Sequence, residues 1–187
     1  SYQKQKLLPF AEYLPFEEQL PWLRKVFPHT PRYQFGKNEP VMVINSQSKQ
    51  INIVPLVCYE SVFTNLVRQG VSANGKILVN MVNDAWFSDN AGKRVHLALA
   101  TFRSVEFNIP LLRVTNDGIS GLIDAKGRFK EESEIGDKME GLKLITVPFK
   151  REATFFERNP FAFLILLGIM TLVSYLTLKM SLRKNCE

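Results

Sequence analysis

Two hydrophobic patterns follow one another in the first 150 residues, and they predict strands and helices in turn. Short apolar runs rich in β-branched residues predict strands, and a helix over 60–69 is expected to end at Gly70. Apolar side chains at helical spacing predict a helix over 93–107. That spacing involves Val95, Ala98, Leu99, Phe102 and Val105. The predicted strands are 41–45, 51–57, 76–82, 111–115 and 142–147, with turns at 46–50, 116–118 and 125–127. This order predicts an α/β domain with a mixed sheet covered by helices.

A different pattern begins at Phe161, where 18 residues through Leu178 carry no charge. A helix of that length is about 27 Å long, close to the thickness of a bilayer core. Tyr175 and Lys179 suit the membrane interface. We therefore predict a transmembrane helix over 161–178; the alternative is a buried core helix.

These patterns divide the chain into four expected parts. They are an α/β domain over 1–150, a linker over 151–160, the transmembrane helix over 161–178 and a basic tail over 179–187. Basic residues flank both ends of the helix, so charge alone leaves its orientation open. If the tail is cytoplasmic, Cys58 and Cys186 lie on opposite sides of the membrane and cannot pair.

Composition indicates a globular protein and gives little support for a nucleic-acid-binding one. A hydrophobic content of 45% with 22% charged residues is typical of a globular chain, and 187 residues suffice for one domain with a core. The net charge is +6, but the 24 Lys and Arg residues are scattered, which argues against a nucleic-acid partner.

The stretch "VPLVCYESVF" places Cys58 at the end of an apolar strand, directly before the predicted helix. One interpretation is a buried structural thiol, because free cysteine packs as a small hydrophobe. The other is a nucleophile, because a helix N-terminus favours a thiolate. Glu60 is, on position alone, an acidic residue favoured at a helix start.

The stretch "YQKQKLLPFAEYLPF" also bears charged residues in an unusual setting. Lys4 and Lys6 alternate along an extended run and are expected to point to opposite faces. Glu12 lies between Phe10 and Tyr13, an aromatic setting unusual for a solvated carboxylate. The alternative is a surface loop with incidental charges.

Together these motifs resemble the apolipoprotein N-acyltransferases of the nitrilase (carbon–nitrogen hydrolase) superfamily. The matching stretches are "YQKQKLLPFAEYLPF", "VCYES", "LVNMVNDAWFSDNAG", "RSVEFNIPLLRVTNDGISGLID" and the final apolar helix. The lysine spacing to the PF-x-EY-x-P motif, followed by CYE, is specific, whereas CYE alone is a weak signal. The resemblance implies part of an α-β-β-α sandwich, with a mixed sheet and helices, plus one C-terminal transmembrane helix.

The resemblance also implies roles for particular residues. Cys58 matches the nucleophile that becomes a thioester, and Lys4 matches the lysine of the catalytic triad. The ammonium of Lys4 would stabilise the thiolate and, with the backbone N–H of Tyr59, the oxyanion. Glu12 matches a glutamate that orients the lysine or otherwise supports the site. Glu60 matches the glutamate that follows the nucleophile in this branch.

One member of the Glu–Lys–Cys triad has no match. Its glutamate, the general base, lies well upstream of the lysine in the family, and only three residues precede Lys4. The chain is therefore expected to be the C-terminal portion of a longer enzyme and to be inactive in isolation. Glu12 does not replace the base, and Lys6, which stands where the family often has a histidine, receives no role.

The loop "NDAWF" has two interpretations. Asn83, Asp84 and Trp86 either shape the access of substrate or act as turn and packing residues, and Trp86 and Phe87 would suit contact with lipid. His96, on the following helix, is expected to be a surface or half-buried histidine with no part in catalysis.

The function implied by the resemblance is N-acylation of the diacylglyceryl-cysteine of apolipoproteins. A membrane phospholipid would donate the acyl chain, with no metal or organic cofactor. The expected location is the bacterial inner membrane, with the catalytic domain on the periplasmic side and the tail in the cytoplasm. The alternatives are a nitrilase-type amidase acting on a small amide, and a catalytically incomplete membrane-anchored fragment.

Overall fold

The computed structural model describes residues 1–37, 39–46, 49–87, 89–149 and 151–184. The chain forms two compact units, Ser1–Glu152 and Ala153–Glu187. Cys186 and the end of the predicted basic tail lie outside the described residues, as do residues 47–48 of the predicted turn.

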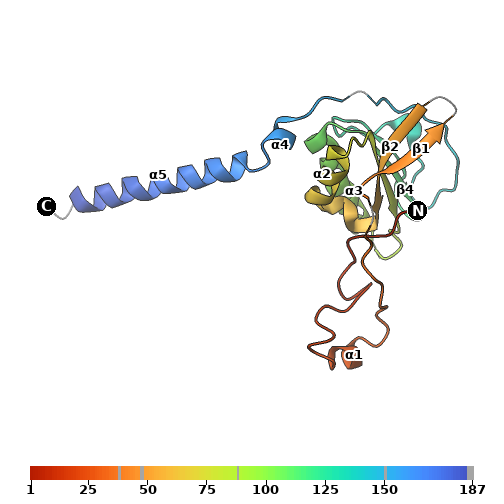
Figure 1. Cartoon of the computed structure of the whole chain (residues 1–187), viewed down its shortest axis with the longest axis horizontal. Helices are drawn as coiled ribbons and strands as arrows, with labels where there is room; N and C mark the ends of the chain where they lie inside the picture. The colour runs from red at the N-terminus through yellow and green to blue at the C-terminus, as the bar shows by residue number, and fades with distance from the viewer. Residues whose placement is uncertain (38, 47–48, 88, 150, 185–187) are drawn as a thin grey trace. The chain divides into compact units, whose positions relative to one another are not determined.

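The first unit contains a mixed five-stranded sheet with the order β1-β2-β3-β4-β5 (Figure 1). The strands are β1 (Met42–Ser46), β2 (Lys49–Val57), β3 (Ile77–Val82), β4 (Leu111–Thr115) and β5 (Gly121–Ile123). The three central strands β2, β3 and β4 are parallel, while β1 and β5 pair antiparallel at the two edges. The predicted mixed sheet is confirmed.

Two helices, α2 (Thr64–Ser72) and α3 (Asn90–Phe107), follow β2 and β3 and pack beside the sheet (Figure 1). The core between the helices and the sheet contains Val54, Leu56, Val67, Leu78, Phe107 and Leu111, all fully buried. Strand side chains alternate between faces, and Met81 and Val114 on the other face remain about half exposed. The buried side chains of the strands therefore lie on the face of the sheet that the helices cover.

The bounds predicted for the helix over 60–69 are wrong, because the α-helix here is α2 (Thr64–Ser72). A short 3₁₀ helix, η1 (Cys58–Val62), follows β2 directly, and the extended backbone of Phe63 separates it from α2. Gly70 lies inside α2 and not at its end, because the helix packs closely on β2. A Cβ atom at Gly70 would lie 2.4 Å from a methyl carbon of Val54.

The buried face of helix α3 is not the apolar face from which the helix was predicted. Asp89 caps its N-terminus by accepting a hydrogen bond from the Gly92 N–H at 2.9 Å. The buried residues of the helix are Lys93, His96, Ala100, Arg103, Ser104 and Phe107. The apolar residues at helical spacing are exposed, namely Val95, Ala98, Leu99, Phe102 and Val105. The periodicity located the helix correctly, but the polar face packs inward.

The strand predicted over 142–147 is wrong, because these residues are irregular. Leu142 and Leu144 are fully exposed. Phe129 instead forms an isolated bridge with Ile123 of β5, and Ile135 forms one with Ser120 directly before β5; both lie nearer along the chain. A short 3₁₀ helix, η2 (Glu131–Ser133), lies between these two bridges.

Residues 8–35, here called the N-terminal arm, leave the body and return to it (Figure 1). The arm contains helix α1 (Leu23–Val26). Glu17 binds Arg24 and Arg32, and hydrogen bonds from these two guanidinium groups lower the pKa of its carboxyl to about 2. Much of the arm's apolar surface is exposed, including Phe10, Phe16, Trp22, Val26, Tyr33 and Phe35.

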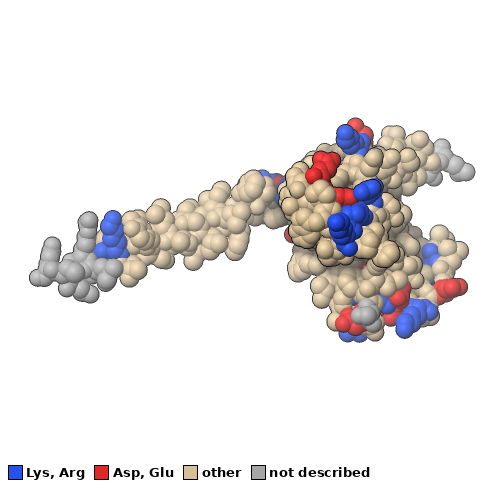
Figure 2. Space-filling view, turned by 90° about the horizontal axis from the view of Figure 1, so that it is seen from below, with Lys and Arg blue, Asp and Glu red and all other residues tan. Residues whose placement is uncertain are grey.

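The second unit contains two helices, α4 (Phe155–Arg158) and α5 (Ala162–Lys184). Helix α4 lies within the predicted linker, and Thr154 caps it by accepting from the Glu157 N–H. In α5, Ala162–Met180 has a mean hydropathy of 1.9 and buries none of its residues within the structure. Figure 2 shows the helix without acidic or basic side chains along most of its length. Its length and composition are sufficient to cross a membrane.

Candidate active site

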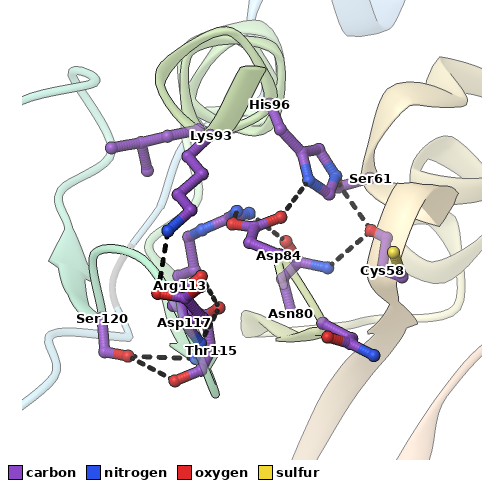
Figure 3. Close-up of polar contacts among 12 residues, drawn as sticks. Cys58, Ser61, Asn80, Asp84, Lys93, His96, Arg113, Thr115, Asp117 and Ser120 are labelled. Atoms are coloured by element: carbon purple, nitrogen blue, oxygen red, sulfur yellow. Dashed lines mark hydrogen bonds and ion pairs between the residues drawn. The ribbon is translucent and has the colours of Figure 1, made fainter. Parts of the chain in front are cut away.

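Cys58 lies at the carboxyl end of β2, where the parallel strands of the sheet end together. In open α/β sheets this edge is where ligands bind. The thiol is free and half-buried, and the backbone of Cys58 has a positive φ of 54°. Its carbonyl oxygen accepts hydrogen bonds from Asn80 Nδ2 at 3.0 Å and Ser61 Oγ at 3.3 Å (Figure 3). The backbone of the candidate nucleophile is therefore held in an unusual conformation by side chains from two elements.

Glu60 is completely buried two residues after Cys58. Its carboxylate accepts four hydrogen bonds of 2.5–3.1 Å, from the Tyr2 hydroxyl and the backbone N–H groups of Gln5, Lys6 and Val57. Burial, and then the charge of Glu60, raise the pKa of the Tyr2 phenol above its ordinary value. Glu60 thus fastens the N-terminal segment to the end of β2, a role that its position at a helix start did not predict.

Lys4 forms an ion pair with Glu12, its Nζ lying 2.7 and 2.8 Å from the two carboxylate oxygens. Glu12 also accepts a hydrogen bond from the Leu8 N–H at 2.8 Å. The backbone around Lys4 is tightly held, because Gly36 donates its N–H to the Lys4 carbonyl at 2.8 Å. A Cβ atom at Gly36 would lie 2.4 Å from the carbonyl oxygen of Gln3, so only glycine permits this approach.

The ion pair lies beside the residue that follows Cys58. Lys4 Nζ is 5.9 Å from the centre of the Tyr59 ring, within the range of a cation–π contact. Burial, followed by the nearby Tyr13 and Glu12, raises the pKa of the Tyr59 phenol. Lys4 and Glu12 also line an open cavity of about 440 Å³. The structure therefore brings Lys4, Glu12, Tyr59 and Glu60 together at the end of β2.

Asp84 has a different environment from the one expected of a residue at a substrate entrance. It is 1% exposed, and its carboxylate is bound by Arg113 Nη2 at 2.6 Å and His96 Nδ1 at 2.8 Å (Figure 3). His96 is itself buried, which corrects the expectation of a surface or half-buried residue. Both side chains belong to a buried polar network, because β3 and α3 place them between the sheet and the helix.

The other two residues of the loop remain at the surface. Asn83 Oδ1 accepts hydrogen bonds from the Ala85 N–H at 3.2 Å and from Asn116 Nδ2 at 2.9 Å, so it shapes the turn. Trp86 is 77% exposed, and Phe87 is exposed beside it. Of the three residues for which substrate access was one of two interpretations, Trp86 is the one with a largely exposed side chain, and Asn83 and Asp84 have the contacts of turn and packing residues.

Two buried residues of the site were not among the candidates predicted from the sequence, namely Asn80 on β3 and Arg113 on β4. Arg113 donates to Asn80 Oδ1 at 2.9 Å, and burial lowers the pKa of its guanidinium despite the opposing charge of Asp84. The available signal was an amide or charged side chain in the middle of each of two apolar strands, "LVNMV" and "LLRVT". Such residues need buried partners, but the partners are not adjacent in sequence. Among the described residues, no group of three or more His, Cys, Asp and Glu side chains is arranged to hold a metal ion.

The fold and the site define a nitrilase-like domain, and comparison with known proteins agrees. The chain belongs to the carbon–nitrogen hydrolase family, which matches residues 1–154. It is similar to the amidase of the nitrilase superfamily from Nesterenkonia AN1, with a TM-score of 0.50 and 20% identity. That likeness covers 74% of this chain and 47% of the amidase, and it confirms the predicted fold.

More specifically, the chain is similar to apolipoprotein N-acyltransferases. It is 31% identical over 175 residues to that of Rickettsia prowazekii, covering 94% of this chain and 34% of the relative. It is 39% identical over 127 residues to that of Haemophilus influenzae, covering 68% of this chain and 24% of the relative. The resemblance found in the sequence motifs is confirmed. The chain spans about a third or less of the length of these curated relatives.

Proposed function

We propose that the protein containing this chain N-acylates the diacylglyceryl-cysteine at the N-terminus of apolipoproteins, taking the acyl chain from a membrane phospholipid. The observation that carries the proposal is the Lys4–Glu12 ion pair beside Tyr59, directly after the thiol at the end of β2. Nitrilase-type chemistry needs a cation next to a cysteine held at a strand end. The similarity to apolipoprotein N-acyltransferases supports the choice of substrates.

In the first half-reaction, the Cys58 thiolate attacks the carbonyl carbon of a phospholipid ester. A C–S bond forms, the C–O bond to glycerol breaks, and the leaving alkoxide takes up the proton that the general base had removed from the Cys58 thiol, so that a lysophospholipid departs. Lys4 and the backbone N–H of Tyr59 stabilise the oxyanion, and Glu12 orients Lys4 through their ion pair. Glu60 supports the site by holding the segment that bears Lys4 against β2.

In the second half-reaction, the free α-amine of the diacylglyceryl-cysteine attacks the thioester. A C–N bond forms, the C–S bond breaks, and the amine gives up a proton to the general base. In this proposal the base is a glutamate outside residues 1–187, so the isolated chain would not turn over. The proposed chemistry requires neither a metal nor an organic cofactor.

A lipid substrate also fits three apolar features, namely helix α5, the N-terminal arm and Trp86. Helix α5 is proposed to anchor the protein in the bacterial inner membrane, with the catalytic domain on the periplasmic side and the tail in the cytoplasm. The N-terminal arm exposes large apolar side chains, among them Phe16 and Trp22, and Trp86 is exposed on the loop after β3. Such side chains suit contact with acyl chains or the bilayer interface.

The test is acyl labelling of the whole protein in membranes with phospholipid that carries radioactive acyl chains. The native protein is expected to acquire label that neutral hydroxylamine releases, as a thioester requires. Cys58→Ser is expected to acquire no hydroxylamine-sensitive label, because an ester to serine would resist this treatment. Cys186→Ser is the matched control and is expected to label normally.

Persistent hydroxylamine-sensitive labelling of Cys58→Ser would exclude Cys58 as the nucleophile. A native protein that takes no label from phospholipid, but releases ammonia from a small aliphatic amide, would instead establish the amidase alternative. Label that is never passed to a diacylglyceryl-peptide would contradict the second half-reaction.

A further inference from the structure

The backbone of Cys58 adopts a conformation that a non-glycine residue rarely keeps without support. Its φ of 54° lies in the left-handed region, where the Cβ atom approaches the backbone too closely. Residues held there usually depend on surrounding contacts, and such residues cluster at functional sites. The support at Cys58 is specific, because Asn80 Nδ2 and Ser61 Oγ both donate to its carbonyl oxygen, at 3.0 and 3.3 Å.

Asn80 bridges the ends of two strands and the nucleophile. It is completely buried on β3, and its Nδ2 also donates to the Leu56 carbonyl at 3.2 Å. Its Oδ1 accepts a hydrogen bond from Arg113 Nη1 at 2.9 Å. A guanidinium has only donors, so the oxygen of the Asn80 amide must face Arg113 and the NH₂ group must face the two carbonyls. Arg113 therefore dictates the direction in which Asn80 donates.

Arg113 is fixed in turn from the opposite side. Asp84 Oδ2 binds its Nη2 at 2.6 Å, and Asp84 Oδ1 lies 2.8 Å from His96 Nδ1 on α3. A carboxylate bound to a guanidinium only accepts, so Nδ1 of His96 must carry a proton. Every hydrogen bond from α3 through Asp84, Arg113 and Asn80 to Cys58 therefore has one permitted direction (Figure 3).

We infer that Asn80 and Ser61 form a carbonyl clamp that positions the nucleophile, with Asn80 oriented by the buried Arg113–Asp84–His96 chain. The clamp keeps the Cys58 carbonyl directed toward the Arg113–Asp84–His96 network. Because this fixes the backbone of Cys58, it also fixes the direction of the thiol. Asn80 and Ser61 do not touch substrate; they are positioning residues that act through the backbone of Cys58. The inference rests on the proposed role of Cys58 as the nucleophile, but not on the identity of the acyl donor.

The test measures acylation of Cys58 by an activated ester, p-nitrophenyl butyrate, in the whole protein. The burst of p-nitrophenol reports thioester formation and is independent of any phospholipid donor. Asn80→Ala removes the clamp, and Asn80→Asp keeps the acceptor for Arg113 but replaces the donor by an oxygen. Both variants are expected to slow the burst at least tenfold, with an unchanged ester concentration at half-maximal rate.

The matched control is Asn52→Asp, the same chemical change on β2. The Asn52 amide also donates to a backbone carbonyl, that of Ala73 at 3.5 Å, but it lies six residues before Cys58. Asn52→Asp is expected to release the burst of p-nitrophenol at the native rate.

Burst rates of all variants are compared from pH 6 to 9, because a positioning effect lowers the rate at every pH. A charge effect of the new carboxylate would instead move the midpoint, and would do so only in Asn80→Asp.

Folded Asn80→Ala protein that bursts at the native rate would overturn the inference, as would a slowing that appears only in Asn80→Asp. If neither Asn80 variant folds, Ser61→Ala decides, since it removes the second donor and leaves Arg113 untouched. It is expected to slow the burst about threefold, and a native rate would overturn the clamp. Absence of phospholipid labelling with a normal native burst would contradict the proposed donor while leaving the clamp testable.

Discussion

The Lys4–Glu12 ion pair is the single contact on which the proposed chemistry most depends. It lies in a partly buried setting, with 12% of the Lys4 side chain and 24% of the Glu12 side chain exposed. Partial burial limits screening by water, which favours the electrostatic effect that the proposed mechanism assigns to the Lys4 ammonium. Lys6, two residues further on, instead lies over the Phe63 ring at 5.9 Å.

Replacing Lys4 by Met is therefore expected to reduce acylation of Cys58 strongly, by at least a hundredfold, because in the proposed mechanism the oxyanion loses a charged donor. Lys6→Met is the matched control and is expected to retain acylation within about threefold of the native rate. The measurement is the initial rate of thioester formation. Equal losses in the two variants would show that Lys4 has no special role.

At the level of elements, the close packing of α2 on β2 supports the strand that leads to Cys58. Gly70 brings the helix so close to Val54 that no side chain fits between them. The same strand ends at Val57, directly before Cys58, so the packing of α2 affects the support of the candidate nucleophile.

Gly70→Ala is expected to destabilise the fold by about 1–3 kcal/mol, because the added methyl group overpacks the helix against Val54. The intrinsic helix preference of alanine over glycine offsets less than about 1 kcal/mol of this. Gly141→Ala is the control, since a Cβ atom there has its nearest neighbour at 3.6 Å. Thermal unfolding in detergent measures both variants, and equal melting temperatures would contradict the close approach.

Element prediction from the sequence succeeded where the signal was local. The central strands follow from short apolar runs rich in β-branched residues, and the helix over 93–107 follows from apolar residues at helical spacing. The strand over 142–147 failed because a strand needs a partner, and Ile123 of β5 and the preceding Ser120 pair with Phe129 and Ile135 instead. The helix over 60–69 failed because a 3₁₀ turn and an extended Phe63 precede α2, and no periodicity distinguishes these alternatives.

At the scale of the whole molecule, the proposed membrane anchor would bring the nitrilase-like domain to the proposed lipid substrates. Leu172→Arg places a charge near the middle of α5 and is expected to cost about 2.5–3.5 kcal/mol for insertion. The fraction of protein resistant to alkaline carbonate extraction should fall accordingly, while Leu172→Ala should remain in the membrane. Unchanged resistance of the arginine variant would contradict a spanning role for α5.

The sequence by itself determined the class of the domain, the apolar helix and the candidates Cys58, Lys4, Glu12 and Glu60. Apolar runs and hydrophobic periodicity, which are set by neighbouring residues, indicated the α/β order and the apolar helix, while the motifs that resemble the carbon–nitrogen hydrolase family supplied the class and the candidate residues. Only the tertiary structure decided what surrounds them. It turned the polar face of α3 inward, fastened the N-terminal segment through Glu60, and enclosed Asp84 and His96 in the network behind Cys58. These outcomes depend on which distant groups satisfy one another's hydrogen bonds when buried, and a linear pattern does not contain that information.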